Sequence, residues 1–394
     1  MKAAAAGRRS FLRAACRHCG ALGLGSLGLA ALAQEARPVS IPTSRFTRPA
    51  LDTDEGGLWA LMDREETRLR RSAFVLRDAS LTAYLQQLAC RLAGDHCPDV
   101  RVHVVRSPLF NANMAPNGMM QVWTGLLLRA ENEAQVAAVV GHEIGHYLER
   151  HTLEQLRDAR NRAAFGQFMA LFGAAGTLAN IAVLAGMFSF SREQESRADA
   201  IGMELMLRAG YDGREAAQVW DNLIGELKVT GGEDAGRRSV MMATHPPAEN
   251  RRDELLRLAG GRTGRVGADE YQLAIAPHRM QLLQDEIRRG QWEESLVLFG
   301  RMLARRPDDA QVLYARGEVL RQRDGEGDAA RALDDLRRAT AAATPPPEAF
   351  RSLGLLLRRT DDRPGATNAF ERYLAAAPQA PDAGLIQQYL TELK

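Results

Sequence analysis

Cysteine is scarce in this chain of 394 residues, which has four, and aromatic residues make up only 6% of it. Four cysteines are too few for a disulfide-dense scaffold, and 45% hydrophobic with 25% charged residues excludes a disordered or collagen-like chain. The formal net charge is only +2, and five of the 51 basic residues lie in the first 33 positions, which leaves 46 basic against 49 acidic residues beyond them. A balance this close to zero predicts no nucleic-acid partner.

The N-terminal segment has the pattern of an export signal. Arg8 and Arg9 precede an uncharged stretch rich in glycine, alanine and leucine, which ends at a small-residue site. This order is typical of a cleavable signal peptide, and the paired arginines resemble the twin-arginine type. The sequence therefore predicts a signal peptide over residues 1–33, cleavage after Ala33 and a periplasmic location. An uncleaved anchor helix is the alternative.

The four cysteines fall into two pairs. Cys16 and Cys19 lie inside the predicted signal peptide, so a redox or metal motif is not expected there. Cys90 and Cys97 remain in the mature chain, seven positions apart, and the signal directs them to an oxidising compartment, where disulfides persist. We therefore expect a structural disulfide between these two residues, with two free thiols as the alternative.

The mature chain is expected to form two domains. Apolar spacing and turn residues predict helices over 53–95, 131–150 and 193–208, strands over 100–105 and 119–123, and a turn-rich segment over 111–118. Four glycines between positions 260 and 267 indicate a boundary. We expect one domain over 34–260, a linker over 261–271 and a second domain over 272–394.

The second domain contains an internal repeat. Gly354 is followed by Ala366, Phe370 and Pro378 at offsets of 12, 16 and 24 residues, and parts of this pattern recur around Gly317. The pattern resembles the tetratricopeptide repeat, in which the glycine lets two antiparallel helices touch and the proline ends the second helix. We expect an all-α solenoid with a concave face for a partner chain, and a generic helical bundle is the alternative.

The strongest chemical signal is an H-E-x-x-H motif at His142, Glu143 and His146. Residues four apart lie on one face of a helix, so both imidazoles can bind one zinc ion. Glu143 stays free to accept the proton of a water molecule. The apolar run before the motif suits a buried helix. The alternative is an ordinary helix with two surface histidines.

A catalytic zinc site normally has a third protein ligand, and it must come from elsewhere in the chain. The metzincin class would require histidine at position 152, but this residue is threonine, which excludes that class. Glu195 and Asp199 stand four apart in S-R-E-Q-E-S-R-A-D-A-I-G, about fifty residues after the motif. These two segments together resemble the HtpX/Ste-type zinc endopeptidases.

The resemblance implies roles for several residues. It makes Glu195 the third zinc ligand and Asp199 the carboxylate that orients a ligand histidine. It also implies that segment 111–118 leads into the edge strand of the active site, which would hold the substrate backbone by strand addition. The segment T-H-P at 244–246, with an arginine after it, also matches the family. His245 would stabilise an oxyanion, bind zinc as a fourth ligand that keeps the enzyme latent, or be only a loop histidine.

An uncharged stretch runs from residue 163 to residue 191 and is long enough to cross a membrane. A single crossing would place His142 and Glu195 on opposite sides of the membrane, and two crossings do not fit in this length. We therefore expect helices that cover the active site, with at most peripheral contact to a membrane.

These observations predict a mainly α (α+β) fold: a gluzincin-type zinc peptidase domain with a small β-sheet, followed by the repeats. Together with the repeats, the peptidase motifs resemble the periplasmic members of the family that act in outer-membrane assembly. We expect one Zn²⁺ per chain, held by His142, His146 and Glu195, and cleavage of misfolded or stalled envelope proteins. The resemblance also suggests an assembly machinery as partner of the repeats. The alternative function is a chaperone or assembly factor with a latent zinc site, and an exopeptidase is a weaker third.

Overall fold

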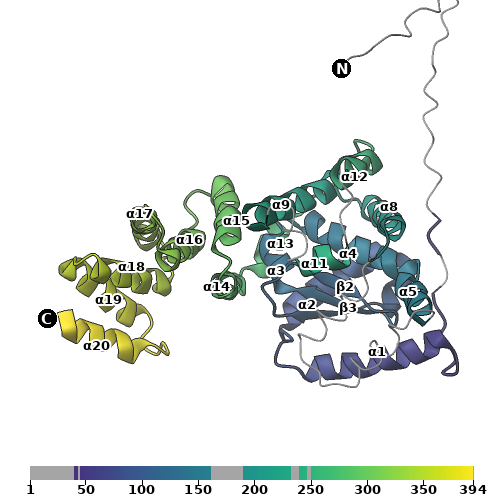
Figure 1. Cartoon of the computed structure of the whole chain (residues 1–394), viewed down its shortest axis with the longest axis horizontal. Coiled ribbons are helices and arrows are strands. Elements are labelled where there is room, and N and C mark those ends of the chain that lie inside the picture. Colours follow the sequence, from purple (N-terminus) through teal and green to yellow (C-terminus); the bar gives the residue numbers. More distant parts are fainter. Residues whose placement is uncertain (1–39, 43–44, 161–189, 232–238, 246–249, 394) are drawn as a thin grey trace, which may run out of the picture. The chain divides into compact units, whose positions relative to one another are not determined.

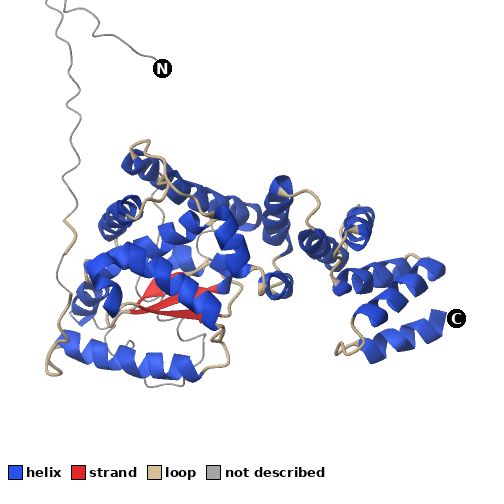
Figure 2. Cartoon of the chain, turned by 180° about the vertical axis from the view of Figure 1, so that it is seen from behind, coloured by secondary structure: helices blue, strands red, loops and turns tan. Residues whose placement is uncertain are grey.

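The computed structural model describes residues 40–42, 45–160, 190–231, 239–245 and 250–393, as helices around one small sheet (Figures 1 and 2). The predicted signal peptide with Cys16 and Cys19, and nearly all of the uncharged stretch 163–191, lie outside the described residues. The predicted fold class is confirmed, because a mainly helical region with a three-stranded sheet is followed by helices alone.

The N-terminal part contributes two helices and the sheet. The elements are α1 (Asp54–Arg71), α2 (Ala79–Ala93), the 3-10 helix η1 (Gly94–Asp99), β1 (Arg101–Val105), β2 (Ala112–Met114) and β3 (Met119–Trp123). The side chains of Thr53 and Asp78 accept hydrogen bonds from the first turns of α1 and α2. Between these helices the chain leaves the helical conformation, and Val75 bridges to Val105. The single helical stretch expected over 53–95 is therefore two helices.

The sheet has the order β1-β3-β2, with β1 parallel and β2 antiparallel to the central strand β3. One expectation is corrected by this topology. The segment 111–118 was expected to be a turn leading into the edge strand, but the strand that follows it, β3, is paired on both sides. The edge strands are β1 and β2, of which β2 lies inside the segment itself, and the tight turn after β2 requires Gly118 at a φ of +87°.

Among the described residues, seven further helices lie in the part of the chain around the sheet. They are α3 (Thr124–Arg129), α4 (Glu133–Leu148), α5 (His151–Arg160), α8 (Arg192–Arg208), α9 (Arg214–Gly231), α11 (Val240–Thr244) and α12 (Arg251–Ala259). The helices expected over 131–150 and 193–208 correspond to α4 and α8. A capping box between Ser191 and Gln194 begins α8, and Gly210 follows its end with a φ of +78°.

The remaining described chain consists of helices, most of which pack against the next helix along the chain as helical hairpins. They are α13 (Ala268–Ile275), α14 (Arg279–Arg288), α15 (Trp292–Arg305), α16 (Ala310–Arg323), α17 (Asp328–Ala341), α18 (Pro347–Arg359), α19 (Arg363–Ala376) and α20 (Ala383–Leu393). The glycine of the repeat pattern lies where two helices touch, since a Cβ on Gly354 would meet the ring of Phe370 at 2.5 Å. A Cβ on Gly317 would meet Leu336 at 2.8 Å in the preceding hairpin.

Ion pairs join the hairpins to the region around the sheet, and those made by Arg129 are buried. Arg129 of α3 pairs with Glu226 of α9 at 2.7 Å and with Glu286 of α14 at 2.9 Å. Arg106 makes a bidentate contact with Asp285 of α14 at 2.8 Å. One hydrophobic core extends from α2 to α18. The domain boundaries placed at 260 and 271 stay predictions.

Two other expectations concern the stability and the location of the chain. A disulfide joins Cys90, in α2, to Cys97, in η1, as predicted. None of the helices among the described residues is both long enough and apolar enough to pass through a lipid bilayer.

Candidate metal centre

The H-E-x-x-H motif lies in α4, a helix whose sixteen residues are all buried. The helix begins at Asn132, whose side chain accepts a hydrogen bond from the backbone N–H of Gln135 at 2.9 Å. Helical spacing places the imidazoles of His142 and His146 one above the other, with their Nε2 atoms 3.1 Å apart. The sequence pattern therefore produces two converging nitrogen ligands.

Glycines bring α8 unusually close to this helix. A Cβ on Gly145 would lie 2.8 Å from the carbonyl oxygen of Ala198, and a Cβ on Gly202 would lie 2.8 Å from the backbone nitrogen of His142. Neither position leaves room for a side chain, so the two backbones are in direct contact. This close approach carries the carboxylates of α8 to the imidazoles of α4.

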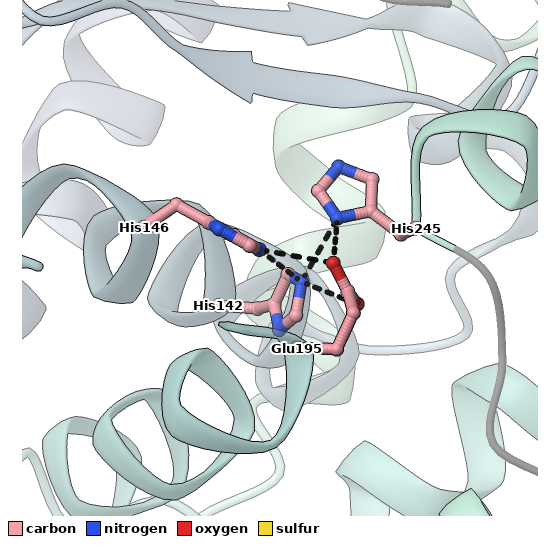
Figure 3. Close-up of side chains that lie close together, drawn as sticks. All are labelled: His142, His146, Glu195 and His245. Carbon is pink, nitrogen blue, oxygen red and sulfur yellow. Dashed lines mark hydrogen bonds and ion pairs between the residues drawn. The ribbon is translucent and has the colours of Figure 1, made fainter. Parts of the chain in front are cut away.

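Four side chains converge at this contact: His142, His146, Glu195 and His245 (Figure 3). One ligand atom from each lies within 4.8 Å of the others. The Glu195 carboxylate is 3.3 Å from Nε2 of His146 and 3.5 Å from Nε2 of His142. Nδ1 of His245 is 2.8 Å from the same carboxylate. The structure thus brings together the three predicted zinc ligands and the predicted possible fourth.

A second layer of contacts orients these groups. The Asp199 carboxylate lies 2.8 Å from Nδ1 of His142, so the opposite nitrogen of that ring faces the cluster. The Arg251 guanidinium donates to Asp199 at 2.7 Å and stacks over the Trp220 ring at 4.0 Å. Sequence reasoning named Asp199 and noted Arg251, but it gave no signal for Trp220, which comes from α9.

The charges of the cluster shift its pKa values in opposite directions. Burial lowers the pKa of His142, but the carboxylates of Glu195 and Asp199 outweigh it and raise the value to about 9. The pKa of His146 is lowered well below its usual range, first by burial. Burial opposes ionisation of Glu195, yet the neighbouring His245 and His142 lower its pKa. Glu195 is therefore an ionised ligand over the physiological range.

Glu143 has the position expected of a general base. Its side chain is only 3% exposed, and its Oε1 atom lies 3.5 Å from Nε2 of His245. That oxygen has no hydrogen-bond partner among the described residues. Burial raises the pKa of this carboxyl group. A raised pKa suits a group that accepts and later donates a proton near neutral pH.

Two residues near the cluster were not expected from the sequence. His151 has its Nδ1 atom 2.9 Å from Nδ1 of His146, on the side away from the cluster. Burial and the Arg197 guanidinium lower the pKa of His151 to about 4, so its ring is neutral. The Phe190 ring stacks on the His146 ring at a centroid distance of 3.9 Å. Local periodicity carried no signal for either contact.

The other three histidines among the described residues have partners outside the cluster. His103 hydrogen-bonds with Glu66 at 2.9 Å, and His278 lies 3.4 Å from Asp78. Nε2 of His96 contacts the carbonyl oxygen of Pro42 at 2.8 Å. These three histidines therefore have structural contacts and no place in the metal cluster.

The cluster fits a metal ion by its donors. Histidine nitrogens and a carboxylate are the ligands that zinc takes in catalytic sites. The buried Oε2 atom of Glu195 has no hydrogen-bond partner among the described residues, although such atoms are normally satisfied. The Arg251 guanidinium lies 3.2 Å from this atom as an ion-pair partner, and a bound metal ion would supply a further contact. The site is therefore compatible with zinc.

Comparisons with known proteins agree with this geometry. The model of peptidase family M48 matches residues 75–259. The Arabidopsis thaliana protein named mitochondrial metalloendopeptidase OMA1 is 36% identical over 150 residues, which cover 38% of this chain and 30% of that protein. The Escherichia coli K12 protein named beta-barrel assembly-enhancing protease is 28% identical over 200 residues, 47% of this chain and 40% of that one.

A third relative extends the match slightly. A Vibrio cholerae protein named putative beta-barrel assembly-enhancing protease is 28% identical over 226 residues, 53% of this chain and 44% of that protein. The chain spans less than half of the length of each of these three relatives. The family match and the names support the predicted enzyme class, a zinc metalloendopeptidase.

Proposed function

Residues 75–259 form a domain of peptidase family M48, and on that premise we propose that the chain is a periplasmic zinc metalloendopeptidase. Its substrates would be misfolded or stalled envelope proteins, especially outer-membrane proteins. The convergence of His142, His146 and Glu195 beside a buried Glu143 carries this proposal. The names of the bacterial relatives support the substrate class.

Each residue of the site would have its own role in the cleavage reaction. A zinc ion held by His142, His146 and Glu195 would supply a Lewis acid that polarises the scissile carbonyl and acidifies a water molecule. Glu143 would take the proton of the attacking water and then deliver it to the leaving amine. Asp199 holds the ring of His142 in the orientation that binding requires. The free edge of β2 would hold the substrate backbone by strand addition.

His245 supports a second candidate function. Its Nδ1 atom lies 3.2 Å from Nε2 of His142, within the same cluster. A fourth protein ligand would fill the position that a catalytic zinc keeps open. In that case the site would be latent, and the chain would act mainly as a chaperone or assembly factor through its helical hairpins. If His245 instead turns away, it would stabilise the oxyanion.

The helical hairpins contain a cavity where a partner chain would bind. A cavity of about 550 Å³ lies among α14, α16, α18 and α19, and Tyr314, Arg351 and Tyr373 are among its lining residues. We propose that these hairpins bind an unfolded substrate or an outer-membrane assembly machinery. Neither nucleic acid nor an integral membrane contact forms part of the proposal.

The first experiment compares the purified mature protein with Glu143→Gln in degradation of an unfolded outer-membrane polypeptide, with zinc measured in both. Loss of a general base predicts a rate at least about 100-fold lower with zinc unchanged. Glu149→Gln is a matched control, because this residue ends the same helix outside the cluster. Cleavage by the wild type and the control, but not by Glu143→Gln, would support the peptidase.

The other outcomes separate the two candidates. If both proteins hold about one zinc and neither cleaves, the latent site is favoured, and His245→Ala should then gain activity. A chaperone would also keep complementing a deletion strain without Glu143. If neither protein holds zinc, the assignment of the ligands is wrong.

A further inference from the structure

Arginine gathers at the C-terminal end of α1. Residues 64–77 contain five arginines and two glutamates, in a chain whose basic and acidic residues otherwise nearly balance. Of the glutamates, Glu66 is buried and Glu65 pairs with Arg68 at 2.6 Å. All five arginines are exposed, and together with Phe74 they form the surface that we call the basic patch: Arg64, Arg68, Arg70, Arg71 and Arg77.

Most of these arginines have no acidic partner. Among the described residues, no carboxylate forms an ion pair with Arg64, Arg70 or Arg71, so Arg68 is the member of this helix end that is neutralised. The Arg77 guanidinium donates to the backbone oxygens of Arg70 and Ser72, at 3.1 and 3.0 Å, and not to a carboxylate. The positive charge of the basic patch therefore remains available to a partner outside the chain.

An exposed aromatic residue follows the arginines of the helix. Phe74 lies three residues beyond the end of α1 and is 47% exposed. Hydrogen bonds fix its backbone on both sides, because its N–H donates to Oγ of Ser72 at 3.1 Å and its carbonyl oxygen accepts from the N–H of Arg106 at 2.7 Å. A large apolar side chain that is held at the surface among basic residues is typical of proteins that bind at a lipid interface.

The helices α1 and α4 lie on opposite faces of the sheet (Figures 1 and 2). Leu69 of α1 packs in one cluster with Met119 and Trp123 of β3. The alternate residues of this strand, Met120 and Val122, point to the other face and belong to the core that includes α4. A surface that binds the basic patch would therefore leave the metal cluster uncovered.

We propose that the basic patch docks the protein on a membrane surface that contains anionic phospholipids. Arginine binds phosphate groups by paired hydrogen bonds, and clusters of this size beside a membrane attract anionic lipids. Basic residues in the last turn of a helix also stabilise its dipole, but the dipole does not account for Arg64, which lies about two turns before the end of α1. The exposed ring of Phe74 favours a lipid surface over an acidic polypeptide.

Cosedimentation of the purified mature protein with lipid vesicles tests this proposal. We expect binding to vesicles of phosphatidylcholine with a third of phosphatidylglycerol, none to phosphatidylcholine alone, and loss of binding in about 1 M salt, where the screening length is about 3 Å. The double variant Arg70→Gln/Arg71→Gln should bind the anionic vesicles about 25-fold more weakly, because each arginine near such a surface contributes about a factor of five. Phe74→Ala should bind about fivefold more weakly, because it loses apolar surface that the lipid would bury.

The matched control is the double variant Arg358→Gln/Arg359→Gln. These adjacent arginines also end a helix, α18, but they pair with Glu392 at 3.0 Å and with Asp324 at 2.9 Å. Both double variants lower the net charge by two, so an effect of overall charge alone would weaken both equally. Weaker binding by the α1 variant, with the control near the wild type, would support the proposal.

Several outcomes would overturn the proposal. One is equal weakening in the two double variants, and another is a wild type that ignores anionic vesicles but binds polyglutamate, which would identify an acidic polypeptide as the partner. Lower stability of Arg70→Gln/Arg71→Gln with unchanged vesicle binding would assign the arginines to the helix dipole alone. If this variant does not fold, as judged by circular dichroism, Phe74→Ala decides, and unchanged binding by that variant would overturn the proposal.

Discussion

Glycine allows helices to touch in two regions of this molecule, but the contacts differ in kind. In the peptidase region, Gly145 of α4 faces the backbone of Ala198 in α8, where an added Cβ would lie 2.8 Å from a carbonyl oxygen. In the C-terminal hairpins, Gly354 of α18 faces the ring of Phe370 in α19. The first contact joins backbone to backbone, whereas the second joins backbone to side chain.

The two contacts differ because the first sets the distance between site residues, whereas the second only packs two helices together. The contact of α4 with α8 fixes the distance between His142 and Glu195, and metal binding tolerates errors of only about 0.2 Å. A backbone cannot shift locally as a side chain can. The contact of α18 with α19 only has to be well packed, because no chemistry depends on its spacing. Glycine therefore fixes the spacing of the cluster residues in the peptidase region, and it allows tight packing of two helices in the hairpins.

The largest expected effect tests this claim at α4. Gly145→Ala should push α8 away from α4, because the new methyl group would meet the backbone of Ala198. We expect zinc content well below one per chain and a cleavage rate about 100-fold lower, because displaced ligands lose both affinity and alignment. Metal analysis of the purified variant measures the first and peptide cleavage the second.

The control for this variant is a helical glycine with free space around it. Gly225→Ala in α9 adds a methyl group that meets nothing within 4 Å. It should leave zinc content unchanged and raise stability by up to about 1 kcal/mol, because alanine favours helix more than glycine does. Equal zinc content in Gly145→Ala and Gly225→Ala would contradict the claim that the contact at Gly145 sets the distance between the zinc ligands.

A moderate effect is expected for the matching change in the hairpins. Gly354→Ala places a methyl group 2.5 Å from the buried ring of Phe370. We expect a free energy of unfolding lower by about 2 kcal/mol, as is common for overpacked sites, with zinc content and cleavage unchanged. Urea unfolding measures this value, and Gly300→Ala, which meets nothing within 4 Å, should not show the loss. Loss of zinc in Gly354→Ala would show that the two regions are not independent.

The smallest expected effect concerns charge. Glu66 of α1 accepts hydrogen bonds from Arg101 at 2.9 Å and Asn117 at 3.2 Å, and its contact with His103 is 2.9 Å. Burial alone would raise its pKa, but His103 and Arg101 lower it to about 2. The contribution of Glu66 is therefore complete above its unfolded pKa of 4.5 and disappears as the pH falls towards 2.

Glu66→Gln checks this pH dependence. We expect the variant to be less stable than the wild type by on the order of 1 kcal/mol at pH 7, with the difference shrinking below pH 4.5. Urea unfolding at several pH values measures it. Glu293→Gln removes a half-exposed pair with Arg323 in the hairpins and should change little at any pH. A constant difference for Glu66→Gln would contradict the assignment.

The amino-acid sequence alone predicted the pairs of site residues that lie only a few positions apart on one helix. His142 and His146 are four apart on one helix, as are Glu195 and Asp199 on another, and this spacing identifies the face that each pair shares. The cluster formed by these residues was expected from the family resemblance. The pattern around Gly354 likewise predicted that two helices touch at this glycine.

The rest depends on contacts between distant segments, which leave no periodic signal. Trp220 supports Arg251 from α9, and Phe46, which precedes α1, packs on Tyr147 at the end of α4. Strand order is also a tertiary property, and for that reason the expected edge strand was wrong. A strand as short as β2, with three residues, does not show the alternation by which strands are recognised.

The disulfide between Cys90 and Cys97 has a practical consequence. A thiol pair seven residues apart stays reduced in a cytosol rich in glutathione and closes in an oxidising compartment. The state of the pair therefore distinguishes a chain in a reducing compartment from one in an oxidising compartment. Blocking free thiols in whole cells with a heavy alkylating reagent would separate the two populations on a gel, and the ratio of the bands would report the fraction of chains in which the disulfide has closed.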